Sequence, residues 1–406
     1  MRPIVPARHP QMEEDMAEAR LYFDWNAGAP IKAAARSRLV ELLGRPGNGS
    51  SVHAEGRAAR AALETARRSI ARLVGAEAKG VTFCSGGTEA ANAVLTPEWT
   101  LFGKPCRLDR LLVSAVEHPA VARGGRFPEG CVEVIPVDRN GVVDLAALER
   151  RLAALSAAGM RALVSVMAAN NETGVIEPVA DIARIGRAHG ALVHSDAVQA
   201  AGRLPLDIET LGLDVLTLSA HKIGGGQGAG AIVRGRNGFG FSPLVTGGGQ
   251  ESWMRAGTEN VAAVAAFGVA ADEALADLGR ASEIAARRDR LASIIREMAP
   301  DAVVFGEGAA RLPNTLAFAV PGVAAETAVI AFDLAGVALS SGSACSSGKV
   351  TASPVLTAMG VDPALVRGGL RVSIGPETID DEIEAFALRA RNVLAAMKKQ
   401  HGTAAA

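Results

Sequence analysis

Short apolar runs alternate with longer amphipathic stretches over much of the chain. The runs of strand length are 80–84, 111–114, 132–135, 163–167, 191–196 and 215–218, and the stretches with helical spacing are 57–74, 145–155 and 182–189. Strands that alternate with helices in this way are typical of a mostly parallel sheet with helices on both faces. The pattern therefore predicts an α/β fold built on a doubly wound sheet.

The pattern changes after about residue 280. Residues 283–298 and 381–399 have the spacing of long helices, whereas 314–320 and 369–374 alternate like antiparallel strands. Because strands and helices no longer alternate one by one, this part of the chain predicts a smaller α+β domain.

Length and composition agree with two domains in a globular enzyme. The 406 residues are more than one hydrophobic core usually serves. We place the large domain at 32–278 and the small domain at 1–31 together with 279–406, with an irregular leader over 1–20. Hydrophobic residues make up 49% and aromatic residues only 4%, which favours alanine-rich helices packed on a sheet.

Charge and cysteine content exclude several classes of partner and site. A net charge of −1 gives no electrostatic reason to expect nucleic acid or an anionic membrane as partner. The N-terminus lacks the apolar core of a signal peptide, so we expect a cytoplasmic protein. The cysteines form no Cys-x-x-Cys pair, so neither a disulfide framework nor a metal site is expected.

Two chemically distinctive residues stand at the ends of predicted strands. Lys222 follows the run 215–218 and precedes a glycine-rich stretch, and Asp196 ends the preceding strand. Open α/β sheets bind ligands at the carboxyl ends of their strands. Pyridoxal phosphate (PLP) needs a lysine that holds it as a Schiff base and an acid that keeps its pyridine nitrogen protonated. The pair therefore predicts a PLP site.

A third strand end has the pattern of a phosphate site. Gly86, Gly87 and Thr88 follow the run 80–84 and open a predicted helix. Backbone N–H groups at a helix N-terminus attract anions, and the threonine adds a hydroxyl. A Gly-Gly turn before a helix is common and predicts little by itself. It indicates a phosphate site here because it follows the same kind of strand end as Asp196 and Lys222.

These segments occur with others in an order that resembles cysteine desulfurases of the NifS/IscS type, which are PLP enzymes of fold type I within the class V aminotransferases. The resemblance runs from Tyr22 to about Ile374 and rests on Tyr22–Asp24, Ser50–Gly56, Ser85–Ala90, Glu117-His118, Asn170–Gly174, Asp196–Gln199, Ser219–Lys222, Arg255–Asn260, Ser340–Cys345 and Arg371. It implies a large domain with a mostly parallel, seven-stranded type of sheet and a smaller α+β domain.

The resemblance also implies roles for individual residues around the cofactor ring. Lys222 would bind the cofactor as an internal aldimine and move protons, Asp196 would pair with the pyridine nitrogen, and His118 would stack on the ring and take part in proton transfer. Gln199 and Asn171 would bond the phenolic oxygen.

The remaining implied roles concern the phosphate and the substrate. Arg371, with Asn171, would bind the carboxylate of L-cysteine. The phosphate would be held by Gly87, Thr88, Ser219 and His221, and by Thr258 from the second subunit of a homodimer.

Cys345 distinguishes sulfur removal from transamination in this reading. It lies in 340–354, a segment of mostly small and polar residues that predicts a mobile loop. Its thiolate would take the sulfur of the substrate as a persulfide, leave alanine, and pass the sulfur to an acceptor protein of iron–sulfur cluster assembly or thiolation.

Other residues have simpler interpretations. His194 lies inside an apolar strand and predicts a hydrogen-bonded core histidine, and Cys84 predicts a small packed hydrophobe. His118 precedes a proline and has a turn residue as its alternative. Asp196 has a helix cap as its alternative.

The chain departs from the family pattern at three places. Residues 25–29 (Trp-Asn-Ala-Gly-Ala) replace a run that usually ends in two threonines, Gly226 replaces a proline, and Pro376 replaces an arginine. Two other functions stay open beside cysteine desulfurase. One is a selenocysteine lyase or related PLP lyase, and the other is a catalytically silent binding partner with the same fold.

Overall fold

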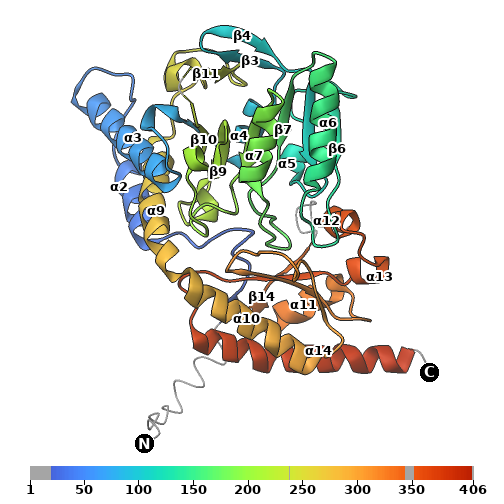
Figure 1. The fold of residues 1–406 in the computed structure, drawn as a ribbon. Helices are drawn as coiled ribbons and strands as arrows, with labels where there is room; N and C mark the ends of the chain where they lie inside the picture. Colours follow the sequence, from blue (N-terminus) through green and yellow to red (C-terminus); the bar gives the residue numbers. More distant parts are fainter. Residues whose placement is uncertain (1–19, 237, 343–351, 405–406) are drawn as a thin grey trace, which may run out of the picture.

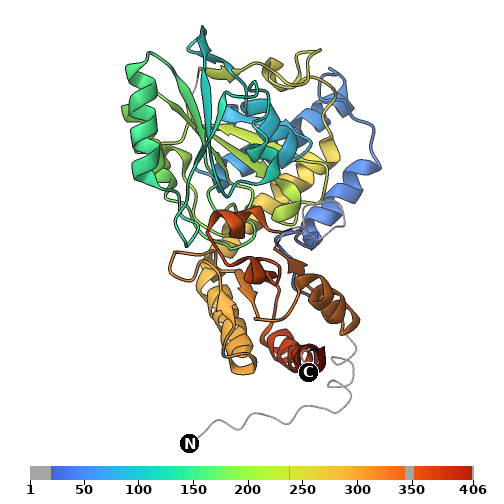
Figure 2. The same cartoon turned by 90° about the vertical axis from the view of Figure 1, so that its right-hand side faces the viewer.

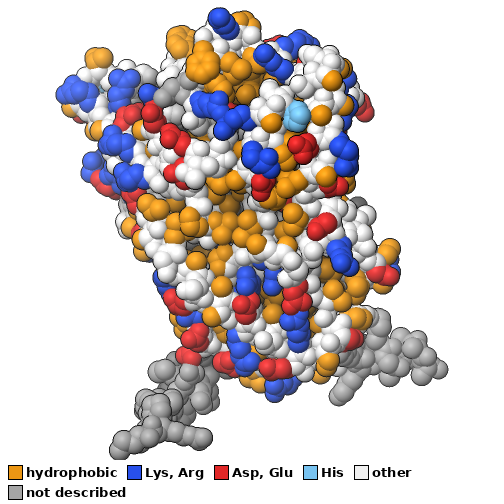
Figure 3. All heavy atoms as spheres, in the orientation of Figure 1, with side chains coloured by type: hydrophobic (Ala, Val, Ile, Leu, Met, Phe, Trp, Pro, Cys, Tyr) orange, Lys and Arg blue, Asp and Glu red, His pale blue; other side chains and the backbone are white. Residues whose placement is uncertain are grey.

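The structure is a computed structural model that describes residues 20–236, 238–342 and 352–404. Most of the expected leader and Cys345 therefore lie outside the described residues. Among the described residues, no helix has both the length and the apolar character needed to cross a membrane. Acidic and basic side chains are interspersed over the face shown in Figure 3, in keeping with the net charge of −1.

A seven-stranded sheet forms the centre of the large domain (Figure 1). Its strands, in spatial order, are β2 (Val81–Cys84), β10 (Gly230–Arg234), β9 (Val215–Ser219), β8 (Leu192–Asp196), β7 (Ala162–Ser165), β5 (Arg110–Ser114) and β6 (Val132–Ile135). All neighbours from β9 to β6 pair in parallel, and only β10 runs antiparallel to both of its neighbours. The predicted mostly parallel sheet is confirmed.

Helices cover both faces of this sheet, as Figure 2 shows from the side. The helices of this part are α2 (Ala33–Leu43), α3 (Ala54–Leu73), α4 (Gly87–Val94), α5 (Pro119–Ala122), α6 (Leu145–Ala157), α7 (Val179–Ala188), α8 (Ile208–Leu211) and α9 (Val261–Asp277). Small residues let α3 and α9 pack closely, because a Cβ at Gly268 would lie 2.5 Å from Cα of Ala66. A small sheet of β3 (Glu98–Leu101), β4 (Lys104–Arg107) and β11 (Phe239–Phe241) lies at one end.

Helix α3 begins three residues earlier than the hydrophobic spacing predicts. Nδ1 of His53 accepts a hydrogen bond from the backbone N–H of Gly56, so His53 caps the helix. A cap satisfies a backbone donor that has no partner inside the helix, and this extends the helix beyond its amphipathic part.

The C-terminal part has its own sheet and its own hydrophobic core. The sheet contains β12 (Val303–Val304), β13 (Thr315–Ala319), β16 (Leu370–Ser373) and β15 (Ser340–Ser341), all paired antiparallel. The helices around it are α10 (Ala281–Met298), α11 (Ala325–Leu334), α12 (Pro354–Ala358), α13 (Pro363–Val366) and α14 (Asp380–Ala404). The predicted α+β arrangement is confirmed.

The N-terminal segment lies with this C-terminal part. Strand β1 (Leu21–Tyr22) pairs in parallel with β14 (Val337–Ala338), and Phe23 packs in the same core as Phe386. A short 3₁₀ turn over Leu278–Arg280 is all that separates α9 from α10. The domain limits at 32 and 278 stay a prediction.

Candidate active site

A cavity of about 360 Å³ lies at the carboxyl ends of the parallel strands and is lined by side chains from both parts of the molecule. It gathers all but two of the site residues that the sequence predicts. Those in its wall are Gly87, Thr88, His118, Asn171, Asp196, Gln199, Ser219, His221, Lys222 and Arg371. Thr258 is exposed and does not line this cavity, and Cys345 lies outside the described residues.

Asp196 is the last residue of β8, and its carboxyl group is short of charged partners. One oxygen accepts a hydrogen bond from the backbone N–H of Val198 at 2.9 Å. Burial raises the pKa of Asp196 to about 6, and the nearby Lys222 charge opposes this rise. A buried carboxyl in this state gains stability when a cationic N–H donor is placed beside it.

Lys222 ends the short 3₁₀ turn that follows β9, and backbone oxygens hold its ammonium group. Nζ donates to the carbonyl oxygens of Asn26 at 2.6 Å and Ala27 at 2.9 Å. Both acceptors belong to the unusual run 25–29. Carbonyl groups carry no titratable charge, so they orient the lysine without neutralising it.

Two histidines near Lys222 are neutral at pH 7. Burial, followed by the Lys222 charge, lowers the pKa of His221 to about 4 and also lowers the pKa of His118. Nδ1 of His118 accepts a hydrogen bond at 3.1 Å from the backbone N–H of Ala120. Since a neutral imidazole has one donor and one acceptor nitrogen, Nε2 of His118 carries the proton. His118 is thus both the cap of α5 and part of the cavity wall.

Arg371 enters the cavity from β16 and is already held by two oxygens. Its Nη2 makes an ion pair of 2.6 Å with Asp24, and its Nη1 donates at 2.9 Å to the carbonyl oxygen of Asn171. Its buried Nε has no hydrogen-bond partner among the residues that the structure describes. A guanidinium held in one orientation in a cavity wall is suited to a small carboxylate, because it combines a positive charge with a planar set of donors.

Helix α4 begins at Gly87, directly beside the cavity. A Cβ at Gly87 would lie 3.1 Å from Val198 and 3.5 Å from Ser219, so a side chain there would narrow the space over the helix N-terminus. Arg255 donates to Glu89 of α4 at 3.0 Å, which brings the segment that contains Thr258 close to this helix.

Sequence reasoning missed several residues that organise the cavity. Asn26 and Ala27 act through backbone carbonyls, which have no sequence signature, and only the unusual composition of 25–29 marked them. Arg203 donates to both the carbonyl and the side-chain oxygen of Gln199. Asp24 belongs to a motif of the family resemblance, but its partner Arg371 is distant in sequence.

Two simpler predictions are confirmed. His194 is fully buried and bonds Ser165 at 2.8 Å and Thr217 at 3.0 Å, and burial lowers its pKa to about 3. Cys84 packs in a hydrophobic cluster, and burial raises the pKa of its thiol to about 12. Neither residue lines the cavity.

Comparison with known proteins agrees with this arrangement. Residues 21–386 match the family model described as aminotransferase class V. The chain is 35% identical to cysteine desulfurase IscS of Dictyoglomus turgidum, over 89% of this chain and 91% of that protein. It is 40% identical to a cysteine desulfurase of Cereibacter sphaeroides, over 90% and 93%. A solved NifS-like protein of Rickettsia africae superposes with a TM-score of 0.82 at 33% identity, covering 93% and 99%.

Proposed function

The chain belongs to the class V aminotransferase family as a cysteine desulfurase of the NifS/IscS type, and from this premise we propose how its own residues perform that activity. Enzymes of this family depend on PLP. The observation that carries the proposal is the joint presence, in one cavity, of Lys222, the buried acid Asp196 and the N-terminus of α4.

The residues of the cavity fit PLP chemically. Burial raises the pKa of the Asp196 carboxyl group, and a cationic ring nitrogen beside it would stabilise the carboxylate and lower that pKa. Gly87 leaves space over the N-terminus of α4 for a phosphate, and Thr88, Ser219 and His221 supply further polar groups. When bound, PLP supplies an electron sink that stabilises negative charge on the substrate.

Lys222 has two tasks in this proposal. It would attach the cofactor covalently, and once the amino group of the substrate has replaced it there, its amine would move protons to and from the substrate. The carbonyl oxygens of Asn26 and Ala27 hold Nζ close to the cavity when it is not attached to the cofactor. They keep the lysine in position for the next proton transfer.

His118 is placed to assist as a neutral imidazole. Its Nε2 carries the proton, because Nδ1 accepts from the backbone of Ala120. Burial and the Lys222 charge lower its pKa, so the imidazole would add no second positive charge beside a bound cofactor.

Arg371 binds the carboxylate of L-cysteine. The Asp24 ion pair and the Asn171 carbonyl hold its guanidinium in one orientation in the wall of the cavity. A substrate bound through its carboxylate presents its amino group to Lys222, and this fixes which end of the amino acid reacts.

Cys345 is the sulfur acceptor. Both described flanks of its segment lie beside cavity residues. Ser340 pairs with Arg371 across β15 and β16, and Ser353 donates at 2.6 Å to Glu172, the neighbour of Asn171. The Cys345 thiolate attacks the substrate sulfur, so that a sulfur–sulfur bond forms and the carbon–sulfur bond breaks. The carbon takes a proton and becomes the methyl group of alanine.

The persulfide on Cys345 is then cleaved by a reductant or an acceptor thiol. We further propose that the enzyme is a homodimer in which Thr258 contacts the phosphate in the other subunit's cavity. Thr258 is exposed in the single chain, in keeping with this role. An acceptor protein of iron–sulfur cluster assembly or thiolation completes the proposed set of partners.

The covalent attachment tests the proposal at its first step. Purified protein supplemented with PLP is expected to absorb visible light, and borohydride reduction followed by peptide mass spectrometry should find the cofactor on Lys222. Lys222→Ala should keep the fold but lose this adduct, whereas Lys104→Ala, an exposed lysine on β4, should retain it. Attachment at another lysine would contradict the proposed site.

A further inference from the structure

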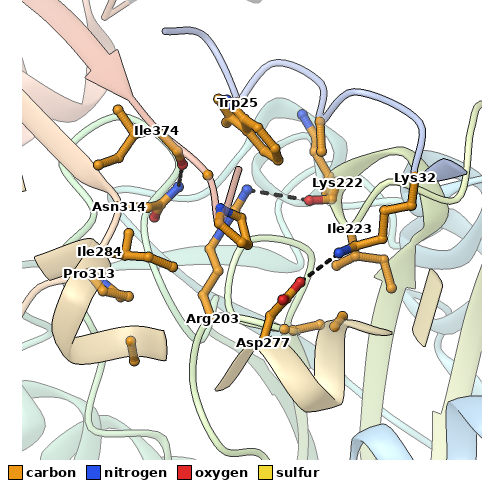
Figure 4. A pocket seen from close by; sticks show the side chains of 17 residues that line it. Trp25, Lys32, Arg203, Lys222, Ile223, Asp277, Ile284, Pro313, Asn314 and Ile374 are labelled. Atoms are coloured by element: carbon orange, nitrogen blue, oxygen red, sulfur yellow. Dashed lines mark hydrogen bonds and ion pairs between the residues drawn. The ribbon is translucent and has the colours of Figure 1, made fainter. Parts of the chain in front are cut away.

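A second, smaller cavity of about 40 Å³ lies behind Lys222, which lines both this cavity and the candidate active site, and Arg203 lies in the wall of the smaller one (Figure 4). In this view the guanidinium of Arg203 points toward the main chain of Lys222, and its Nη2 lies 3.4 Å from the Lys222 carbonyl oxygen. Trp25, Asn314 and the ion pair of Lys32 with Asp277 form other parts of the wall.

Arg203 is a cation without a matching anion. Among the residues that the structure describes, no carboxylate pairs with it, and its hydrogen bonds go to amide and carbonyl oxygens of Gln199 and Lys222. Burial and the Arg371 charge lower its pKa to about 9. A buried charge without a counter-charge is unfavourable for folding, which indicates that Arg203 is there for a role in the site.

The hydrogen bonds of Gln199 show what this function is. Nη1 of Arg203 donates to the side-chain oxygen Oε1 of Gln199 and, at 2.8 Å, to its backbone oxygen. On the other side, Nε2 of Gln199 donates at 3.0 Å to the carbonyl oxygen of Asn26. A guanidinium can only donate and a carbonyl can only accept, so the two partners allow a single orientation of the amide.

We propose that Arg203 is a positioning residue, which locks the Gln199 amide so that its NH₂ group faces the cavity and donates to the phenolic oxygen of the cofactor. One N–H of this group serves Asn26, and the second is left for the cofactor. Without Arg203, the amide can turn over and present an oxygen to another oxygen, which is repulsive. The inference rests on the proposed function, since it needs the cofactor in the cavity.

The visible absorbance of the bound cofactor provides a test that does not depend on turnover. The nitrogen that joins Lys222 to the cofactor carries a proton shared with the phenolic oxygen, and its titration changes the colour. A hydrogen bond donated to the phenolic oxygen stabilises its negative charge, so that the shared proton is lost more easily and its pKa falls. Arg203→Met should therefore raise the pKa of this titration by about half to one pH unit.

A double-mutant cycle distinguishes an effect of Arg203 through the Gln199 amide from a direct effect of the Arg203 charge on the titration. If Arg203 acts through the amide, Arg203→Met should produce no further shift in a Gln199→Leu background. The other groups around Lys222, namely Asp196, His118, His221 and Arg371, are the same in every variant. An equal shift in both backgrounds, or no shift in either, would overturn the inference.

Two further variants keep the test decisive. Arg126→Met is a matched control, because Arg126 also donates only to carbonyl oxygens, those of Ala93, Ser242 and Pro243, and it does not line the cavity. It should leave the titration unchanged.

If Arg203→Met does not fold, Arg203→Lys enters the same cycle with a smaller expected shift, because one ammonium group cannot reproduce the several contacts of the guanidinium. Wild-type protein that stays colourless with PLP would contradict the proposed function itself, and the inference with it.

Discussion

The carbonyl oxygen of Asn26 accepts hydrogen bonds from both Lys222, at 2.6 Å, and Gln199, at 3.0 Å. One backbone atom thus connects the residue proposed to attach the cofactor with a residue proposed to bond it. The position of this carbonyl depends on the Asn26 side chain, which is buried and bonds Thr315 at 2.9 Å and Asn314 at 3.0 Å. The N-terminal segment is therefore part of the site.

Replacement of the Asn26 side chain should destabilise the protein. Asn26→Ala keeps the carbonyl but removes buried hydrogen bonds and leaves their partners unsatisfied, so the free energy of unfolding should fall by about 2–4 kcal/mol. Urea unfolding monitored by circular dichroism measures this. Asn48→Ala, which removes one exposed side-chain contact, should cost about 1 kcal/mol or less. Equal losses in the two variants would refute the structural role.

Loss of the Arg371 guanidinium should weaken substrate binding more than it slows the reaction. We expect Arg371→Gln to raise KM for L-cysteine roughly 10- to 100-fold, because a charge-assisted contact with the carboxylate is removed. Steady-state alanine formation gives both constants. Arg389→Gln, which removes a contact between α14 and the Gly336 carbonyl, is the control. A fall in kcat at unchanged KM would speak against carboxylate binding by Arg371.

The pH dependence of stability should depend partly on Glu177. Burial raises its pKa to about 8, whereas the value for an exposed glutamate is 4.5. Between these values the folded chain binds a proton that the unfolded chain releases, so stability falls as the pH rises from about 4.5 to about 8. Glu177→Gln should make this decline shallower in denaturant unfolding at pH 5, 6.5 and 8. An unchanged slope, equal to that of the exposed control Glu41→Gln, would exclude this contribution.

Mixed dimers can show whether Thr258 serves the other subunit. A Thr258→Ala homodimer should bind PLP about tenfold more weakly, because each phosphate loses a hydroxyl contact. A dimer of one Thr258→Ala subunit and one Lys222→Ala subunit should regain one tight site, in which Lys222 and Thr258 come from different chains. Titration of absorbance with PLP counts such sites. Mixed dimers without a tight site would place Thr258 in the cavity of its own subunit.

Much of the site could be predicted because its reactive side chains stand directly at the ends of apolar runs that the sequence marks as strands. The sequence places Asp196 and Lys222 after buried runs, and the structure brings both into one cavity with His118 and Arg371. What could not be predicted depends on contacts between distant segments or on backbone atoms. The Asp24–Arg371 ion pair and the Asn26 carbonyl are examples. Arg203 is a single charge in a turn of small and apolar residues, and nothing in the sequence places it behind Lys222.

One departure from the family pattern has a structural counterpart. Trp25 packs so closely on Gly375 that a Cβ there would lie 2.3 Å from the indole ring. The tryptophan therefore requires glycine at a position that is distant in sequence, next to Pro376. Hydrophobic periodicity carries no information about such a pairing, and only the tertiary structure reveals it.

The most direct test of the account is the release of sulfide and alanine from L-cysteine, with a reductant present, by wild-type protein and by Cys345→Ser. We predict equal amounts of alanine and sulfide from the wild type, and loss of both in the variant while PLP remains bound. If Cys345→Ser released sulfide and alanine at the wild-type rate, or if only selenocysteine were consumed, the proposed transfer of sulfur to Cys345 would be contradicted.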